Sequence, residues 1–194
     1  SLQGAVAAAA ALLAEADQRW SERASAADRF ALRMGYIKLL RISGDLRSLP
    51  ELLAQAENQA STGADRVQWG IEQALLQAAQ GQHELAQATI DALAQSVSEV
   101  GQPALRIGWH DARAVIALAR NHVDRAREEF EAAFALARRM GQERFSAPLQ
   151  VNAGMLLARE RRYAEADALW NAALEVFAKL GDRRGQATCL GNLA

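Results

Sequence analysis

The chain has 194 residues, of which 51% are hydrophobic and 6% aromatic, and its formal net charge is −1 at pH 7. This balance lacks the basic excess of a nucleic-acid binder, so we expect no direct contact with nucleic acid. Cys189 is the single cysteine, which excludes an internal disulfide and a cysteine cluster for metal, and fits a reducing, cytoplasmic setting. No stretch is long and apolar enough to predict a membrane span.

Apolar residues at three- and four-residue spacing predict helices along the whole sequence. Because proline breaks helices and the chain has only three prolines, we expect these helices to be long. Ser48 and Glu51 have the spacing of a capping box at the start of the third helix. The fold expected is all-α, with about ten helices. Their approximate ranges are 2–21 (a leading helix within residues 1–22), 26–42, 46–63, 65–80, 83–100, 103–120, 123–140, 144–160, 163–180 and 183 onward.

A repeated block organises the second half of the sequence. The block Gly101–Gly141 superposes on Gly141–Gly181, with Ala126 over Ala166 and Phe130 over Trp170. Such a period predicts stacked helix pairs, each supported by its neighbours. We expect one repeat domain over residues 1–194, part of a longer protein. Its units are roughly 26–63, 64–101, 102–141 and 142–181, with a partial unit at 182–194.

Small and large side chains alternate between equivalent places of successive units. Small residues recur in the first helix of each pair, at Ala74, Ala114, Gly154 and Ala194. Large residues recur in the second helix, at Ile90, Phe130 and Trp170. The pattern predicts close helix contact, with the large residues filling the gap between one hairpin and the next. Truncation of Phe130 or Trp170 to alanine should lower the free energy of unfolding by about 3–5 kcal/mol.

These features resemble the tetratricopeptide repeat. The small–large–small spacing of Ala166, Trp170 and Ala173, after Gly154 and Tyr163, carries the resemblance. The segment 181–187, followed by residues 192–194, is similar to the variety of roughly 40 residues found in bacterial regulators and scaffold proteins. The resemblance covers about residues 26–194. It implies a right-handed superhelical solenoid of antiparallel helix pairs.

In the resembled family the first helices line a concave groove that binds ligands. Leu75, Val115 and Met155, at equivalent places of successive units, would form an apolar stripe there; alternatively, they pack between neighbouring first helices. Asn152 and Asn192 match a recurrent asparagine that hydrogen-bonds the backbone of a bound peptide. The groove candidates are Glu72, Leu75, Asp111, Val115, Asn152, Met155, Arg159 and Asn192.

No pattern of residues predicts catalysis, a metal site or a cofactor. The histidines lack ligand spacing, and we interpret the adjacent Glu128 and Glu129 as a solvated face. Trp69 and Trp109, also one repeat apart, are expected in the inter-repeat core rather than stacked on a ligand. Arginines concentrated in the last third are either solvated helix ends or a surface for an acidic partner. They are Arg138, Arg139, Arg144, Arg159, Arg161, Arg162, Arg183 and Arg184.

The sequence therefore predicts a module, not an enzyme, that binds a protein or peptide within a larger bacterial regulatory or signalling protein. We expect a monomer or a weak homodimer that does not contact membranes. Two alternatives stay open. The groove could hold a small effector, as in a sensor domain of a transcription regulator, or the protein could be a self-association device.

Overall fold

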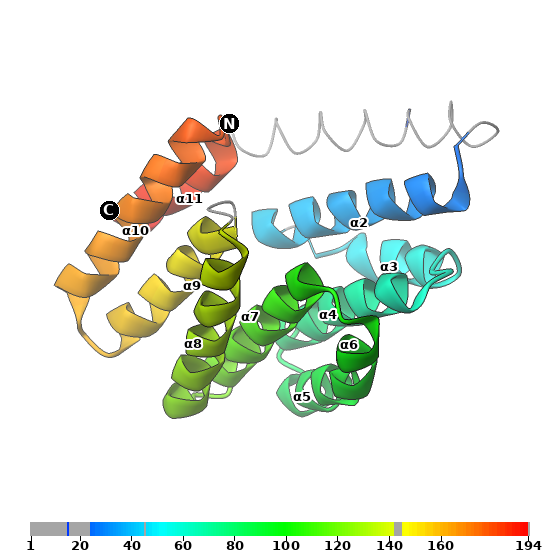
Figure 1. The fold of residues 1–194 in the computed structure, drawn as a ribbon, viewed down its shortest axis with the longest axis horizontal. Helices are drawn as coiled ribbons and strands as arrows, with labels where there is room; N and C mark the ends of the chain where they lie inside the picture. Colours follow the sequence, from blue (N-terminus) through cyan, green and yellow to red (C-terminus); the bar gives the residue numbers. More distant parts are fainter. Residues whose placement is uncertain (1–14, 16–23, 45, 142–144, 194) are drawn as a thin grey trace. The chain divides into compact units, whose positions relative to one another are not determined.

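The computed structural model describes residue 15 and residues 24–44, 46–141 and 145–193. All regular secondary structure among these residues is helical (Figure 1). None of their helices is long and apolar enough to cross a bilayer. The expected leading helix over residues 1–22, apart from Glu15, lies outside the described residues, as do Arg144 and Ala194.

The protein folds into two compact units, Ser1–Val100 and Gly101–Ala194. The division falls at the end of a predicted repeat unit; the single repeat domain stays a prediction. Unit 1 contains α2 (Ala26–Ser43), α3 (Leu49–Glu57), α4 (Gly63–Ala79), α5 (His83–Ala92) and α6 (Ala94–Val100). Unit 2 contains α7 (Pro103–Ala119), α8 (Val123–Met140), α9 (Ser146–Arg159), α10 (Tyr163–Lys179) and α11 (Arg183–Asn192).

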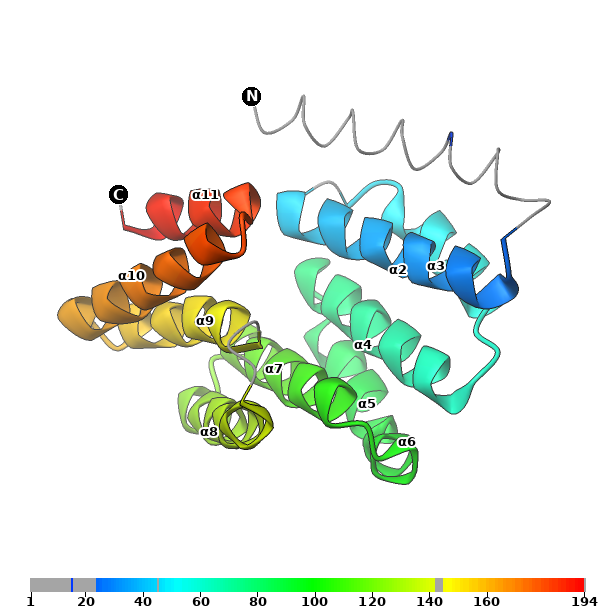
Figure 2. The same cartoon turned by 45° about the horizontal axis from the view of Figure 1, so that its top comes forward.

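Unit 1 is built on α4, which contacts α2 and α3 as well as α5 and α6. Figure 2 shows α2 running beside α4. The periodic apolar face of α2, with Met34 and Ile37 fully buried, packs against α3 and against Leu76 of α4. Arg41 Nε donates to Glu72 Oε2 at 2.8 Å, which adds a partly buried ion pair between α2 and α4.

Three details of unit 1 differ from the expectation. The helix expected over residues 83–100 is interrupted at Leu93, whose side chain lies against Gly70 of α4; a Cβ at Gly70 would sit 2.8 Å from Leu93 Cδ2. The third helix begins at Leu49 and ends at Glu57, well before Gly63. The capping box predicted at Ser48 does not form. Boxes form instead at Ser25 with Asp28 and at Thr62 with Asp65, because these caps have the extended backbone that the motif requires.

Unit 2 is a series of helix pairs. Helix α7 packs with α8 and α9 with α10, while α9 also contacts α7 and α11 (Figure 1). Phe130 of α8 lies in one core cluster with Ala114 of α7 and Leu156 of α9, so it fills the seam between two successive pairs. Trp170 is also buried, and its Nε1 donates to the Val151 carbonyl at 3.1 Å. The predicted burial of both aromatics is confirmed.

The turns between paired helices share one backbone conformation. Gly81, Asn121 and Arg161, at equivalent places of successive repeats, have φ angles of 78°, 62° and 61°. At Arg161 the turn is closed by two hydrogen bonds, from Arg161 N to Ala158 O at 3.0 Å and from Arg162 N to Leu157 O at 2.9 Å. This is the αL helix ending that glycine adopts without steric cost and arginine does not.

Arg161→Gly is therefore expected to raise the free energy of unfolding by about 0.5–1 kcal/mol, since it removes the αL strain. Arg161→Ala, the control, loses the same exposed side chain but keeps a Cβ, so we expect no gain. Urea unfolding followed by circular dichroism measures both. Equal stabilisation by the two substitutions would show that loss of the arginine, rather than backbone strain, is responsible.

Candidate functional site

Unit 2 contains a groove of about 600 Å³ that three first helices and one second helix enclose. Its volume falls in the range of small-ligand pockets. The lining is Val115, Leu118 and Ala119 from α7; Asn152, Met155, Ala158 and Arg159 from α9; Trp170 from α10; and Asn192 from α11. The repeat register explains this convergence, because it places equivalent faces of α7, α9 and α11 toward the same side.

The wall of the groove is mostly apolar. Leu118 and Trp170 form its buried part, and Val115 is half-buried. Met155 leaves 51% of its surface exposed, so this large apolar side chain is open to a ligand in the groove. A flexible, polarisable methionine at a groove surface adapts its shape to different apolar partners.

Three polar side chains border this apolar wall. Asn152 Nδ2 donates to the carboxylate of Asp111, at 2.9 Å to Oδ1 and 3.2 Å to Oδ2. Asn192 Nδ2 is buried and has no hydrogen-bond partner in the described part of the protein. Arg159 Nη1 donates to the Leu118 carbonyl, and among the described residues no carboxylate pairs with Arg159. The groove therefore combines apolar surface with a cation and uncommitted hydrogen-bonding capacity.

Most of the sequence-predicted groove residues meet here. Val115, Asn152, Met155, Arg159 and Asn192 all line the groove. Asp111 is not among the lining residues but binds Asn152 from the preceding first helix. The other two candidates lie in unit 1. Leu75 is half-buried in α4, and Glu72 is 2% exposed with its carboxylate bound to Arg41, so Glu72 serves the packing of α2 on α4.

A buried polar cluster in unit 2 was not predicted. Glu129 Oε2 lies 2.7 Å from His110 Nδ1, and Glu129 Oε1 lies 3.0 Å from Arg113 Nη1. The Arg113 guanidinium also stacks over the Trp109 ring, 4.4 Å from its centroid. The solvated face expected for the glutamate pair is thus wrong for Glu129, which is 8% exposed, and applies only to Glu128.

The sequence did carry a signal for this cluster. Glu129 follows Ala126 by three residues and precedes Ala133 by four, so it shares the core face of α8. A glutamate on that face requires a buried partner, since an unpaired buried carboxylate is strongly disfavoured. Arg113, whose counterpart one repeat later is Ala153, supplies the partner. Among the described residues no group of three or more His, Cys, Asp or Glu side chains could hold a metal ion.

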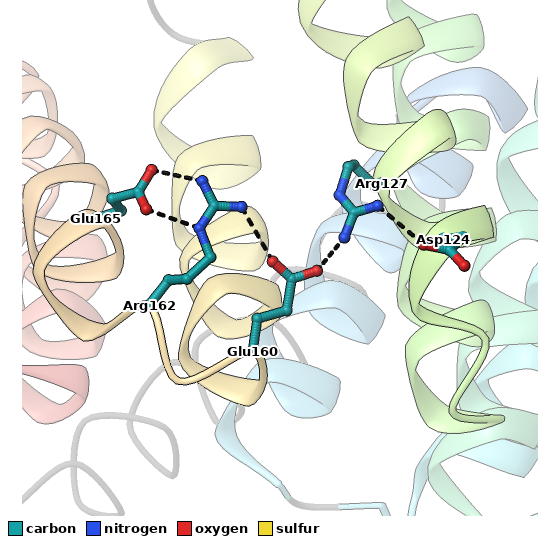
Figure 3. A network of polar contacts seen from close by, with 5 residues as sticks. All are labelled: Asp124, Arg127, Glu160, Arg162 and Glu165. Carbon is teal, nitrogen blue, oxygen red and sulfur yellow. Dashed lines mark hydrogen bonds and ion pairs between the residues drawn. The ribbon is translucent and has the colours of Figure 1, made fainter.

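An ionic network joins the turn after α9 to α8 and α10 (Figure 3). Arg127 binds Glu160 and, at 2.9 Å, Asp124; Arg162 binds Glu160 at 3.1 Å and Glu165 at 2.6 Å. The hydrogen bond with Glu160 raises the pKa of Arg127, and the hydrogen bond with Arg162 lowers the pKa of Glu165. Arg162 is therefore engaged within the fold. Of the described arginines in the last third, Arg159 is the one that lines the groove.

No model of a known protein family matches the sequence, and no curated protein matches it significantly. Among solved structures it is similar to the crystal structure of BtubC (BKLC) from P. vanneervenii. The similarity covers 98% of this chain and 89% of BtubC, with 16% sequence identity and a TM-score of 0.57. At this identity the similarity shows the fold alone.

Proposed function

We propose that the protein is a helical-repeat interaction module of tetratricopeptide type, and that the groove of unit 2 binds an extended peptide segment of a partner protein. The proposal includes the right-handed superhelical stacking of the helix pairs. One observation carries it: residues one repeat apart in the sequence, such as Val115 and Met155 on α7 and α9 and Asn152 and Asn192 on α9 and α11, converge on one groove. A repeat surface of this kind presents an elongated site suited to an extended peptide.

The lining indicates the chemistry of the peptide. Met155, Val115 and Trp170 offer apolar surface, so the peptide should supply a large apolar side chain. Arg159 contributes the one charge among the described lining residues, and its hydrogen bond goes to a neutral carbonyl. An acidic side chain next to the apolar one would complement this charge. Selection for the groove should therefore favour an apolar residue beside Asp or Glu.

Binding is tested with a phage-displayed library of random dodecapeptides selected on the immobilised protein. The enriched peptide is then synthesised with a fluorophore and its affinity measured by anisotropy. We expect Met155→Ala to weaken binding about 5- to 10-fold, because it removes an exposed apolar contact. Leu85→Ala is the matched control, since Leu85 of unit 1 is also 51% exposed and lies outside the groove.

The charge is tested with the same peptide. Arg159→Ala should weaken binding at low salt, and the difference from wild type should shrink as salt screens the attraction. Failure to enrich any peptide would contradict the proposal, as would equal effects of the Met155 and Leu85 substitutions. A metabolite that raised the melting temperature of the protein, without any peptide binding, would favour the small-effector alternative. Membership of a larger regulatory or signalling protein stays a prediction.

A further inference from the structure

Four basic residues outside the groove gather at one end of unit 2. Arg138 and Arg139 lie in the last turn of α8, Lys179 ends α10, and Arg183 begins α11. Figure 1 shows the C-terminal end of α8 and the turn between α10 and α11 at the same end of this unit. We call these four residues the basic end. None of them lines the groove, so the proposed peptide site leaves them without a role.

The charges of the basic end are exposed and not compensated. Among the described residues no carboxylate forms an ion pair with any of the four side chains. The carboxylate of Asp182, in the same turn, instead caps α11 by accepting from two backbone N–H groups at 2.9 and 3.1 Å. At the opposite end of the unit, by contrast, Arg127 and Arg162 share Glu160 (Figure 3). The basic end therefore carries positive charge that the fold does not neutralise.

Stabilisation of helix ends explains only part of this charge. Cations in the last turn of a helix interact favourably with its negative end, which accounts for Arg138, Arg139 and Lys179. Arg183 is instead the first residue of α11, at the positive end of that helix, where a cation is disfavoured. The charge of Arg183 therefore does not stabilise the helix that carries it, and a bound anion would relieve the repulsion.

An exposed leucine lies among these cations. Leu180 directly follows Lys179 and is 57% exposed. Its counterpart one repeat earlier, Met140, is partly buried and packs with Phe145 against the core of unit 2. Gly185 takes the place of Phe145 here, so the equivalent ring is absent beside Leu180. The surface therefore combines positive charge with one apolar contact.

We propose that the basic end is a second interaction surface, which binds an acidic segment of a partner protein. Arginine suits this partner because its guanidinium binds a carboxylate through two parallel hydrogen bonds. An apolar side chain with acidic residues on both sides would cover Leu180 and reach the surrounding cations. A polypeptide supplies both groups. A nucleic acid is disfavoured, because it binds through many phosphates and the net charge of this chain is −1.

The charge is tested with two fluorescein-labelled decapeptides, one of ten glutamates and one with leucine at its fifth position. Their affinities are measured by fluorescence anisotropy. Arg183→Gln should weaken the binding of both peptides about 3-fold at low salt, the loss of one exposed ion pair, and less at high salt. Arg161→Gln is the matched control, because Arg161 is exposed, lies in the turn at the opposite end, and has no ion-pair partner among the described residues. Equal losses in the two variants would show attraction to the overall charge and would overturn the inference.

The leucine separates the basic end from the groove. The leucine peptide should bind the wild type about 3- to 5-fold more tightly than the glutamate peptide, because it buries apolar surface on Leu180. In Leu180→Ala this preference should fall below about twofold, whereas Met155→Ala should keep it. A preference that depends on Met155 and not on Leu180 would place the peptide in the groove. That result would overturn the inference and leave the proposed function standing.

Other anionic partners are the remaining outcomes. A strand of ten thymidine nucleotides and vesicles containing phosphatidylserine are offered to the wild type and to Arg183→Gln. Both should bind more weakly than the leucine peptide. Tighter binding of either one, lost in Arg183→Gln, would assign the basic end to nucleic acid or to anionic lipid instead. Absence of binding by both decapeptides would also contradict the inference, while the peptide selected for the groove tests the proposed function separately.

Discussion

Gly154→Ala is expected to lower the free energy of unfolding of unit 2 by about 2–3 kcal/mol, although alanine is the better helix former. A Cβ at Gly154 would lie 2.3 Å from Trp170 Nε1 and 2.8 Å from Cδ1. The indole is buried and its nitrogen is tied to the Val151 carbonyl, so the ring has little room to retreat. Urea unfolding followed by tryptophan fluorescence would report the change.

The preceding repeat supplies the matched test. Ala114 and Phe130 occupy the places of Gly154 and Trp170, and both are buried. Alanine thus accompanies the smaller ring, and glycine the larger. The double variant Gly154→Ala/Trp170→Phe recreates the earlier pair. Its loss in the free energy of unfolding should be smaller, by at least about 1 kcal/mol, than the sum of the losses of the two single variants. Additive losses would show that the steric coupling between the two positions is absent.

Glu129→Ala has the second large expected effect, a loss of about 2–4 kcal/mol in the free energy of unfolding. Its carboxylate accepts from His110 and Arg113 in a place where Glu129 is 8% exposed. The substitution removes the hydrogen-bond acceptor of His110 and the carboxylate that pairs with Arg113, and breaking a buried polar cluster at one member costs more than the cluster contributes as a whole. Thermal unfolding monitored by circular dichroism measures the loss.

Glu128→Ala is the control for this substitution. Glu128 is the neighbouring residue on the same helix and is exposed, so its removal should change stability by less than about 0.5 kcal/mol. Both variants remove a glutamate side chain, so a difference between their stabilities reports where the side chain points. Similar losses for the two variants would mean that Glu129 is not held in the polar cluster.

Much of the fold of unit 2 follows from the sequence, because there the determinants are local. The helix predicted over residues 123–140 is α8, and Gly141, which follows it directly, has a φ of 60°. The apolar period gives the buried face, and the glycine gives the boundary. Val115, Asn152 and Met155 meet in a groove because the repeat register keeps equivalent faces aligned.

Features that depend on contacts between helices did not follow from the sequence. The sequence predicts one continuous helix over residues 83–100, but the helix breaks at Leu93. The Leu93 side chain lies against Gly70 on another helix. The sequence predicted that Asp111 lines the groove. In the structure its side chain instead accepts a hydrogen bond from Asn152, which lies on a different helix. Tertiary contacts of this kind override the local pattern, and spacing along one helix does not reveal them.

Methionine methyl NMR tests the central claim, that the groove of unit 2 binds the peptide. The protein has three methionines: Met155 is 51% exposed in the groove, Met34 is fully buried in unit 1, and Met140 lies outside the groove in unit 2. With the methyl groups labelled with ¹³C, titration of the selected peptide should shift the Met155 signal and leave those of Met34 and Met140 in place. Saturable peptide binding with an unshifted Met155 signal would contradict the claim.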